Sequence, residues 1–162
     1  MSAFVSRPPI ADAAPPAAPD PELITGDGWW PDVDLAKLRE IVRIDTTVTP
    51  IRLREAAADA IIELGAELAD WRAPLEAAGH ANLHAVPAPL IDGQSQKVTL
   101  YTRAIYSSVG ADLAERLKDI SATTAGMERA EELACPADEF RRNVRWAIAR
   151  LTGKNHVVVE LI

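Results

Sequence analysis

Apolar side chains recur every three or four positions in several stretches, and this spacing places them on one face of an α-helix. The clearest predicted helix starts at Pro50, with a stripe formed by Leu53, Ala57, Ala60, Ile61, Leu64, Leu68 and Trp71. The same spacing predicts helices over about 95–120 and about 137–152. A shorter helix should end near Asp45, after burying Leu35, Leu38, Ile41 and Val42. We therefore expect an all-α fold, a small bundle of about four helices.

Capping residues indicate where these helices begin and end. Asp34 and Thr49 are good N-cap residues, and Pro50 directly after Thr49 suits the first helical position. Pro74 is expected to bend or end the second helix, because proline removes a backbone hydrogen bond. Gly153 should end the last helix.

The helix that starts at Pro50 has a second apolar row, placed opposite the stripe, at Ile51, Ala58, Ile62 and Ala69. An acidic ridge separates the two rows and is formed by Asp59, Glu63, Glu67 and Asp70. A monomer needs to bury only one apolar face of a surface helix. The second face is either covered by other helices of the chain or kept for a neighbouring subunit.

Trp146 is the apolar residue that fits no stripe. The last helix should bury Phe140, Val144, Ala147, Ile148 and Leu151. Trp146 lies about 145° from the centre of that stripe on a helical wheel. Its contact must therefore lie outside the main core contact of this helix.

Both ends of the chain differ from the middle. Residues 1–28 are rich in alanine and proline, which predicts an arm that is disordered or ordered only on a neighbouring subunit. Residues 29–153 form the predicted helical domain. Residues 154–162 form a tail that either tucks back onto the bundle or adds to a partner, and its apolar residues are Val157, Val158, Val159, Leu161 and Ile162.

The net charge of −7 argues against tight binding to the phosphate backbone, which needs clustered basic residues. Residues 1–34 hold much of the acidity, with Arg7 as their single basic residue. The single cysteine, Cys135, excludes an internal disulfide. No apolar run approaches the length of about 20 residues that spans a bilayer, so no membrane contact is expected. These features suit a reducing cytoplasm, or a particle assembled there.

The sequence offers little catalytic chemistry. His80 and His84 have a metal-like spacing, but no third ligand is evident and Gly79 and Pro87 flank the pair. Paired carboxylates are explained by solvated helix faces. We therefore expect no enzyme, no metal and no cofactor. The arginines of the last helix either pair locally or contact an acidic neighbour or passing DNA.

Four stretches carry a resemblance to a known family: WWPDVDLAKLRE followed by TVTPIRLREAA, then IDGQSQKVTLYTRAI, then VRWAIARL. In this order and spacing, from about residue 29 to 162, they resemble the head-completion proteins of contractile-tailed temperate phages, the L-protein (GPL) family. The alanine–proline arm lies outside the resemblance, and residues 121–139 do not align.

The resemblance implies a structural virion protein with an all-helical adaptor fold and no catalysis. A ring of identical subunits would dock beneath the dodecameric portal after genome packaging and help retain the DNA. The ring would also offer a surface to a neck or tail-terminator protein, with non-specific contact to genomic DNA in the channel. The expected location is the head–tail neck of the virion, after assembly in the host cytoplasm.

Two sets of residues are the candidate contacts. For the portal we expect Trp146 and the tail residues Val157, Val158, Val159, Leu161 and Ile162. For the adjacent subunit we expect Ile51, Ala58, Ile62, Trp29, Trp30, Arg52 and Arg54. The two N-terminal tryptophans have an alternative role, which is to pack the first helix onto the core.

A different class of function is the main alternative. In it the chain is a small helical DNA-binding or regulatory protein whose helix over 141–150 enters a groove of the duplex. Strong salt dependence of duplex binding would support this alternative, whereas the acidity of the chain argues against it.

Overall fold

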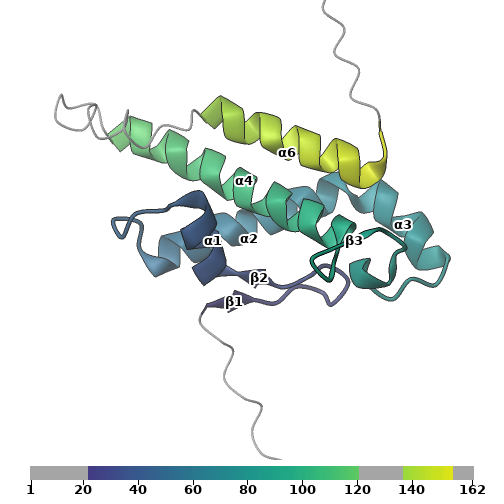
Figure 1. Ribbon diagram of the computed structural model, residues 1–162. Helices are drawn as coiled ribbons and strands as arrows, with labels where there is room; N and C mark the ends of the chain where they lie inside the picture. The colour runs from purple at the N-terminus through teal and green to yellow at the C-terminus, as the bar shows by residue number, and fades with distance from the viewer. Residues whose placement is uncertain (1–21, 121–136, 155–162) are drawn as a thin grey trace, which may run out of the picture.

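The computed structural model describes residues 22–120 and 137–154, and for 117–120 it describes the backbone alone. The described chain is mostly helical (Figure 1). Its longer elements are α1 (Leu35–Val42), α2 (Pro50–Glu67), α3 (Ala69–Ala77), α4 (Gln96–Ile120) and α6 (Ala137–Thr152). The prediction of a small helical bundle is confirmed in its helical part. The expectation of a strictly all-α fold is wrong, because two small sheets are present.

Helix α4 is the centre of the bundle. It contacts α1, α2 and α6, and α6 runs alongside it on the side away from β1 and β2 (Figure 1). Tyr101, Ile105 and Val109 of α4 are completely buried at this centre. The stripes of α2 and α6 pack onto the same core, where Leu64 and Leu151 are also buried. The apolar periodicity therefore identified most of this core.

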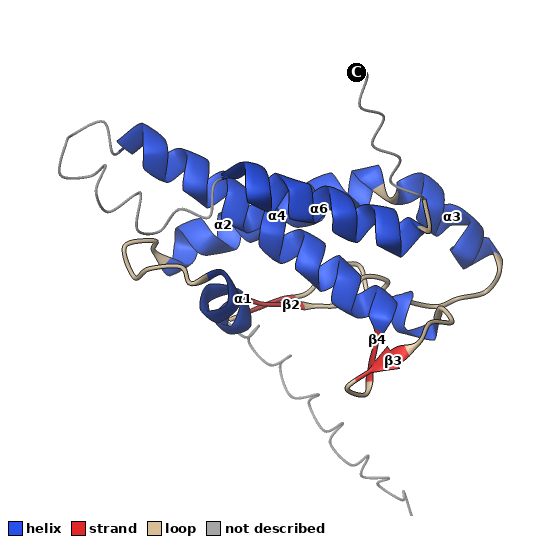
Figure 2. Ribbon diagram, turned by 45° about the horizontal axis from the view of Figure 1, so that its top comes forward, coloured by secondary structure: helices blue, strands red, loops and turns tan. Residues whose placement is uncertain are grey.

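Each sheet has two strands of two residues (Figure 2). Strand β1 (Leu23–Ile24) pairs antiparallel with β2 (Val33–Asp34), and β3 (Leu90–Ile91) pairs with β4 (Gln94–Ser95). The sequence predicts a turn at Asp92-Gly93, and this turn joins β3 to β4. The strands themselves are too short to show an alternating pattern.

The prediction of an arm over residues 1–28 is wrong for the C-terminal part of that range. Residues 22–28 belong to the folded part, because β1 pairs with β2 and the Leu35 amide donates to the Glu22 carbonyl at 2.8 Å. Two-residue pairing leaves no hydrophobic pattern in the sequence, so it was not foreseen. Residues 1–21 of the predicted arm and residues 155–162 of the predicted tail lie outside the described residues.

The predicted caps are confirmed. Asp34 accepts a hydrogen bond from the Lys37 amide at 2.9 Å, and Thr49 accepts one from the Arg52 amide at 3.4 Å. Gly153 has a φ of 71° directly after α6, a conformation that glycine adopts without strain. Local capping chemistry therefore sets these three helix ends.

One detail of the predicted helices is wrong, because the helix that starts at Pro50 is interrupted at Leu68. Pro74 was expected to bend or end a helix near Ala73. It does not end one, since it lies inside α3, and the bend stays a prediction. Leu68 is 1% exposed, and its carbonyl accepts hydrogen bonds from the amides of both Trp71 and Arg72. Leu68 is thus part of the core at the point where the helix is interrupted, and Pro74 costs a short exposed helix only one backbone hydrogen bond.

Ile41 was expected on the buried face of α1 but is 65% exposed. Leu35 and Val42 are seven residues apart and lie within about 20° of each other on a helical wheel, whereas Ile41 is about 100° from Val42. A helix of eight residues makes one narrow contact with the core. Ile41 therefore lies beside the contact.

Candidate interaction surfaces

The apolar row of α2 that faces away from the core has two exposed large side chains. Ile51 and Ile62 are 72% and 69% exposed, whereas Ala58 between them is partly buried. On the opposite side, Leu53 and Leu64 are buried. The predicted stripe of α2 is thus buried, and of the second row the described residues leave Ile51 and Ile62 exposed. The use of this outer face for a subunit contact stays a prediction.

Four acidic side chains follow one flank of α2 at intervals of four residues, and we call them the acid row: Glu55, Asp59, Glu63 and Glu67. All four are exposed, and none forms an ion pair with a described residue. Arg52 lies on the same flank without pairing with them. Like charges four residues apart destabilise a helix. The acid row therefore lacks an ion pair with the described residues, although the charges of Asp59 and Glu55 contribute to raising the pKa of Arg116.

The acidic ridge predicted from the sequence included Asp70 and omitted Glu55. Asp70 lies in α3, so the interruption at Leu68 removes it from the ridge. Glu55 lies four residues before Asp59 and completes the row. The four-residue spacing alone would have found it.

Helix α6 presents a basic and aromatic face, which we call the arginine–tryptophan face: Arg142, Trp146 and Arg150. Trp146 is 41% exposed, and the guanidinium of Arg142 lies 5.0 Å from the centroid of its ring. Arg150 is exposed and pairs with no described residue. Ala147 and Leu151 are buried on the opposite side of the helix. The predicted position of Trp146 outside the core stripe is confirmed, and its expected contact with the portal stays a prediction.

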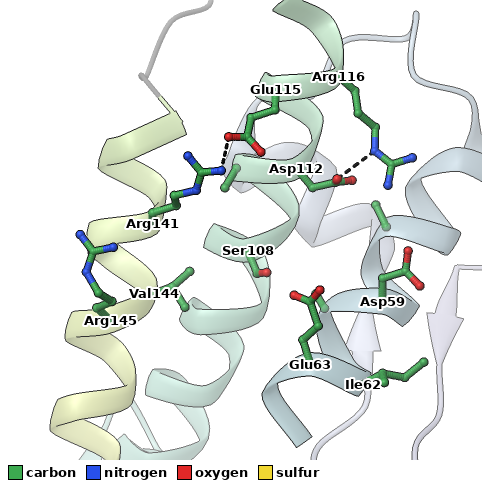
Figure 3. A pocket seen from close by; sticks show the side chains of 13 residues that line it. Asp59, Ile62, Glu63, Ser108, Asp112, Glu115, Arg116, Arg141, Val144 and Arg145 are labelled. Atoms are coloured by element: carbon green, nitrogen blue, oxygen red, sulfur yellow. Dashed lines mark hydrogen bonds and ion pairs between the residues drawn. The ribbon is translucent and has the colours of Figure 1, made fainter. Parts of the chain in front are cut away.

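A groove of about 600 Å³ separates α2 from α6, with α4 at its back (Figure 3). Small apolar side chains contribute to its lining, namely Ala56, Ala60, Ala111 and Val144. The groove lining combines apolar and charged side chains, as protein–protein interfaces do. Its size and lining suit side chains of a partner.

Ion pairs compensate part of the charge in this groove. Arg141 pairs with Glu115, and Arg116 pairs with Asp112 at 2.8 Å (Figure 3). The hydrogen bond from Arg116 to Asp112 raises the pKa of this arginine. Asp59 and Glu63 on one wall, and Arg145 on the other, pair with no described residue. The groove thus has an acidic α2 wall.

Trp29 and Trp30 were expected at the subunit contact, but they are 3% and 7% exposed within their own chain. Trp30 stacks on Tyr101 with ring centroids 4.5 Å apart. Trp29 donates from Nε1 to the His80 carbonyl at 3.3 Å, and Arg72 lies over its ring. The alternative role, packing onto the core, is the one that the structure shows, because aromatic rings of this size gain most from burial.

The two arginines expected at the subunit contact differ in position. Arg54 is half-buried and donates to the Leu23 carbonyl at 3.4 Å, so it is directed toward its own chain. Arg52 is exposed at the start of α2, close in sequence to Ile51. The structure therefore leaves Arg52 accessible to a partner and engages Arg54 internally.

The described residues contain no group of three or more histidine, cysteine, aspartate or glutamate side chains able to hold a metal ion. His80 precedes the short 3-10 helix η1 (Leu83–Ala85), which contains His84. The two histidines therefore do not share one α-helical face. Within the described ranges, no helix is long and apolar enough to cross a membrane.

The model of the family described as phage head completion protein (GPL) matches residues 24–162. The chain belongs to the phage head completion protein (GPL) family. The head completion/stabilization protein of Escherichia phage P2 is 39% identical to it over 148 residues, which cover 91% of this chain and 88% of the relative. Comparison with solved structures gives no match.

Membership of the GPL family confirms the resemblance drawn from the four sequence stretches and extends it to residue 24. The added residues include Ile24 of β1, which the sequence analysis assigned to the arm. The chain is thus a structural component of phage head completion. In this GPL protein the first of the four stretches serves the fold, through Trp29, Trp30 and the Asp34 cap.

Proposed function

We propose that several copies of this chain form a ring on the dodecameric portal of a filled phage head. The ring connects the portal to the neck or tail-terminator protein and helps to retain the packaged DNA. It acts by binding and performs no reaction. Membership of the head-completion family is the observation that carries this proposal. The uncovered apolar row of α2 supports lateral packing, because exposed apolar helix faces mark protein contacts.

The subunits contact one another through the α2 row of Ile51, Ala58 and Ile62, with Arg52 beside it. The tail 157–162 contacts the portal, since a short apolar segment at a chain end can add to a partner. Non-specific contact with the genome is transient, because the net charge of −7 lets DNA slide past. The ring lies at the head–tail neck of the virion and assembles in the host cytoplasm.

Deletion of Val157–Ile162 tests the portal contact. We expect the truncated chain to lose portal binding, because a few large apolar residues carry most interface energy. Its melting temperature should stay that of the full chain, since the deleted residues follow the last described helix. Binding is measured by co-sedimentation with purified portal dodecamers. A control variant with Asn155 and His156 replaced by alanine should bind normally, and full binding by the truncated chain would contradict the proposal.

A further inference from the structure

We propose that the acid row of α2 in one subunit binds the arginine–tryptophan face of α6 in a second copy of this chain. The proposal rests on the assembly of several copies proposed above and names the two surfaces that meet. In it Ile62 lies against the indole of Trp146, with Asp59 and Glu63 facing arginines of the neighbour. Both surfaces are exposed, and the acids and Arg150 lack an ion-pair partner among the described residues.

Charge complementarity indicates which part of the chain binds the acid row. The stretches of the chain that the structure leaves undescribed hold few basic residues: Arg7 in 1–21, Arg129 in 121–136 and none of Lys or Arg in 155–162. Each of these stretches contains more acidic than basic residues. They would therefore be repelled by the acid row. Helix α6 carries four arginines against two acids, Asp138 and Glu139. Arg141 and Arg142 form ion pairs within the chain, whereas Arg145 and Arg150 pair with no described residue.

The apolar parts of the two surfaces also match. An indole is large and rigid, so its burial against an aliphatic side chain gives much contact area at little cost in conformational entropy. Arg142 already stacks on Trp146 and would bring a cation to the acid row with that ring. Aromatic and arginine side chains are the types that dominate interface energies. The contact therefore has an apolar centre with ion pairs around it.

The geometry makes the contact directional. The acid row and the arginine–tryptophan face belong to different helices, which lie on different sides of α4 (Figure 1). Each subunit can therefore bind one neighbour through α2 and another through α6. Such a head-to-tail contact repeats from one subunit to the next. It closes into a ring when the rotation between neighbouring subunits brings the last copy back to the first. This arrangement reassigns Trp146 from the portal contact to the contact between subunits.

Charge reversal in the full-length chain tests the pairing. One variant carries Asp59→Arg and Glu63→Arg, a second carries Arg142→Glu and Arg150→Glu, and a third combines all four changes. We expect each of the first two to weaken self-association about tenfold or more, because like charges then face each other. The combined variant should recover association, since the reversed charges are again complementary. Sedimentation velocity over a concentration series measures the effect.

A matched control carries Asp32→Arg and Glu40→Arg, the same change of charge at exposed positions outside both surfaces. It should associate like the unmodified chain, and added salt should weaken association of both. Misfolding could weaken the self-association of either double variant, but it could not restore self-association in the variant that combines all four changes. Absence of self-association in the unmodified chain, equal association of all variants, or failure of the combined variant to recover would each overturn the pairing.

Cross-linking in completed heads gives an independent readout. Glu63→Cys and Ala149→Cys are combined in a Cys135→Ser background. This pair keeps Trp146 and both arginines of the face, because Ala149 lies about two helical turns after Arg142 on the same side of α6. The heads are oxidised and analysed without reductant. We expect a ladder of covalent multimers. A control with Glu63→Cys and Lys37→Cys should stay monomeric, because Lys37 is exposed on α1. Portal binding without a ladder would overturn this pairing and leave the proposed function standing.

Discussion

A single residue, Asp27, joins the N-terminal segment to the helical core. Its carboxylate accepts hydrogen bonds from the backbone amides of Trp29 and Trp30, at 3.0 and 3.3 Å, and pairs with Arg72 of α3. Burial acts to raise the pKa of Asp27, but these hydrogen bonds outweigh it and the pKa is lowered. The carboxylate therefore positions two aromatic rings that the family's first motif supplies.

Asp27→Asn tests this role through pH. A carboxyl group whose pKa is lowered by folding stabilises the fold above its unfolded pKa of 3.8, and this stabilisation is lost as the pH falls through the lowered value. We expect the variant to be less stable by about 1 kcal/mol at neutral pH, a modest loss because the pair is partly exposed. The difference should vanish well below pH 3.8. Denaturant unfolding across pH measures it.

Asp32→Asn provides the control, since Asp32 is exposed and forms no hydrogen bond with a described residue. It should be about as stable as the unmodified chain at neutral pH. An equal loss in both variants would show that Asp27 has no special role. The sequence could not foresee the ion pair, because its partners are 45 residues apart and Asp27 lies in the predicted arm.

Among the helices, Gly110 allows α4 and α6 to pack closely. A Cβ atom added to it would lie 2.8–3.0 Å from ring atoms of Phe140, so α4 and α6 meet at this point with no room for a methyl group. The sequence placed both residues on helices. It could not show that they face each other, because helix periodicity gives the buried face but not its partner.

Gly110→Ala should therefore destabilise the protein. Alanine gains about 1 kcal/mol over glycine in a helix, but the clash with a rigid ring costs about 1–3 kcal/mol, and we expect a net loss of about 1 kcal/mol. Gly65→Ala in α2 is the matched control, because nothing lies within 4 Å of its added Cβ. It should gain about 1 kcal/mol. Thermal unfolding of both variants measures the contrast, and equal gains would contradict the close contact.

Elements set by local chemistry were foreseen, and elements set by tertiary packing were not. The caps at Asp34, Thr49 and Gly153 depend on neighbouring atoms alone, so the sequence predicts them. The interruption at Leu68 has no capping side chain or proline at that position to announce it. The same limit applies to the candidate surfaces, since the spare face of α2 followed from periodicity whereas the burial of Trp29 and Trp30 needed the assembled core.

The whole molecule carries its two candidate contact surfaces on different helices. Ile51, Ile62 and the acid row lie on α2, while the arginine–tryptophan face lies on α6. Both helices are anchored to α4, so their spacing is fixed before any partner binds. A pre-organised surface of this kind loses little entropy on assembly. Substitutions on the outer faces should therefore affect assembly and leave folding intact.

Ile62→Ser separates these two effects at the scale of the assembled head. Ile62 is 69% exposed, so we expect the free energy of unfolding to change by less than about 0.5 kcal/mol, while the yield of completed heads falls several-fold. Ile61→Ser, the same substitution at the partly buried neighbour, should instead destabilise the chain by about 1–3 kcal/mol. Unfolding curves and counts of completed heads are measured on both variants. A normal yield from Ile62→Ser would remove the outer face of α2 from the contact between subunits, because no other property of that exposed side chain connects it to assembly.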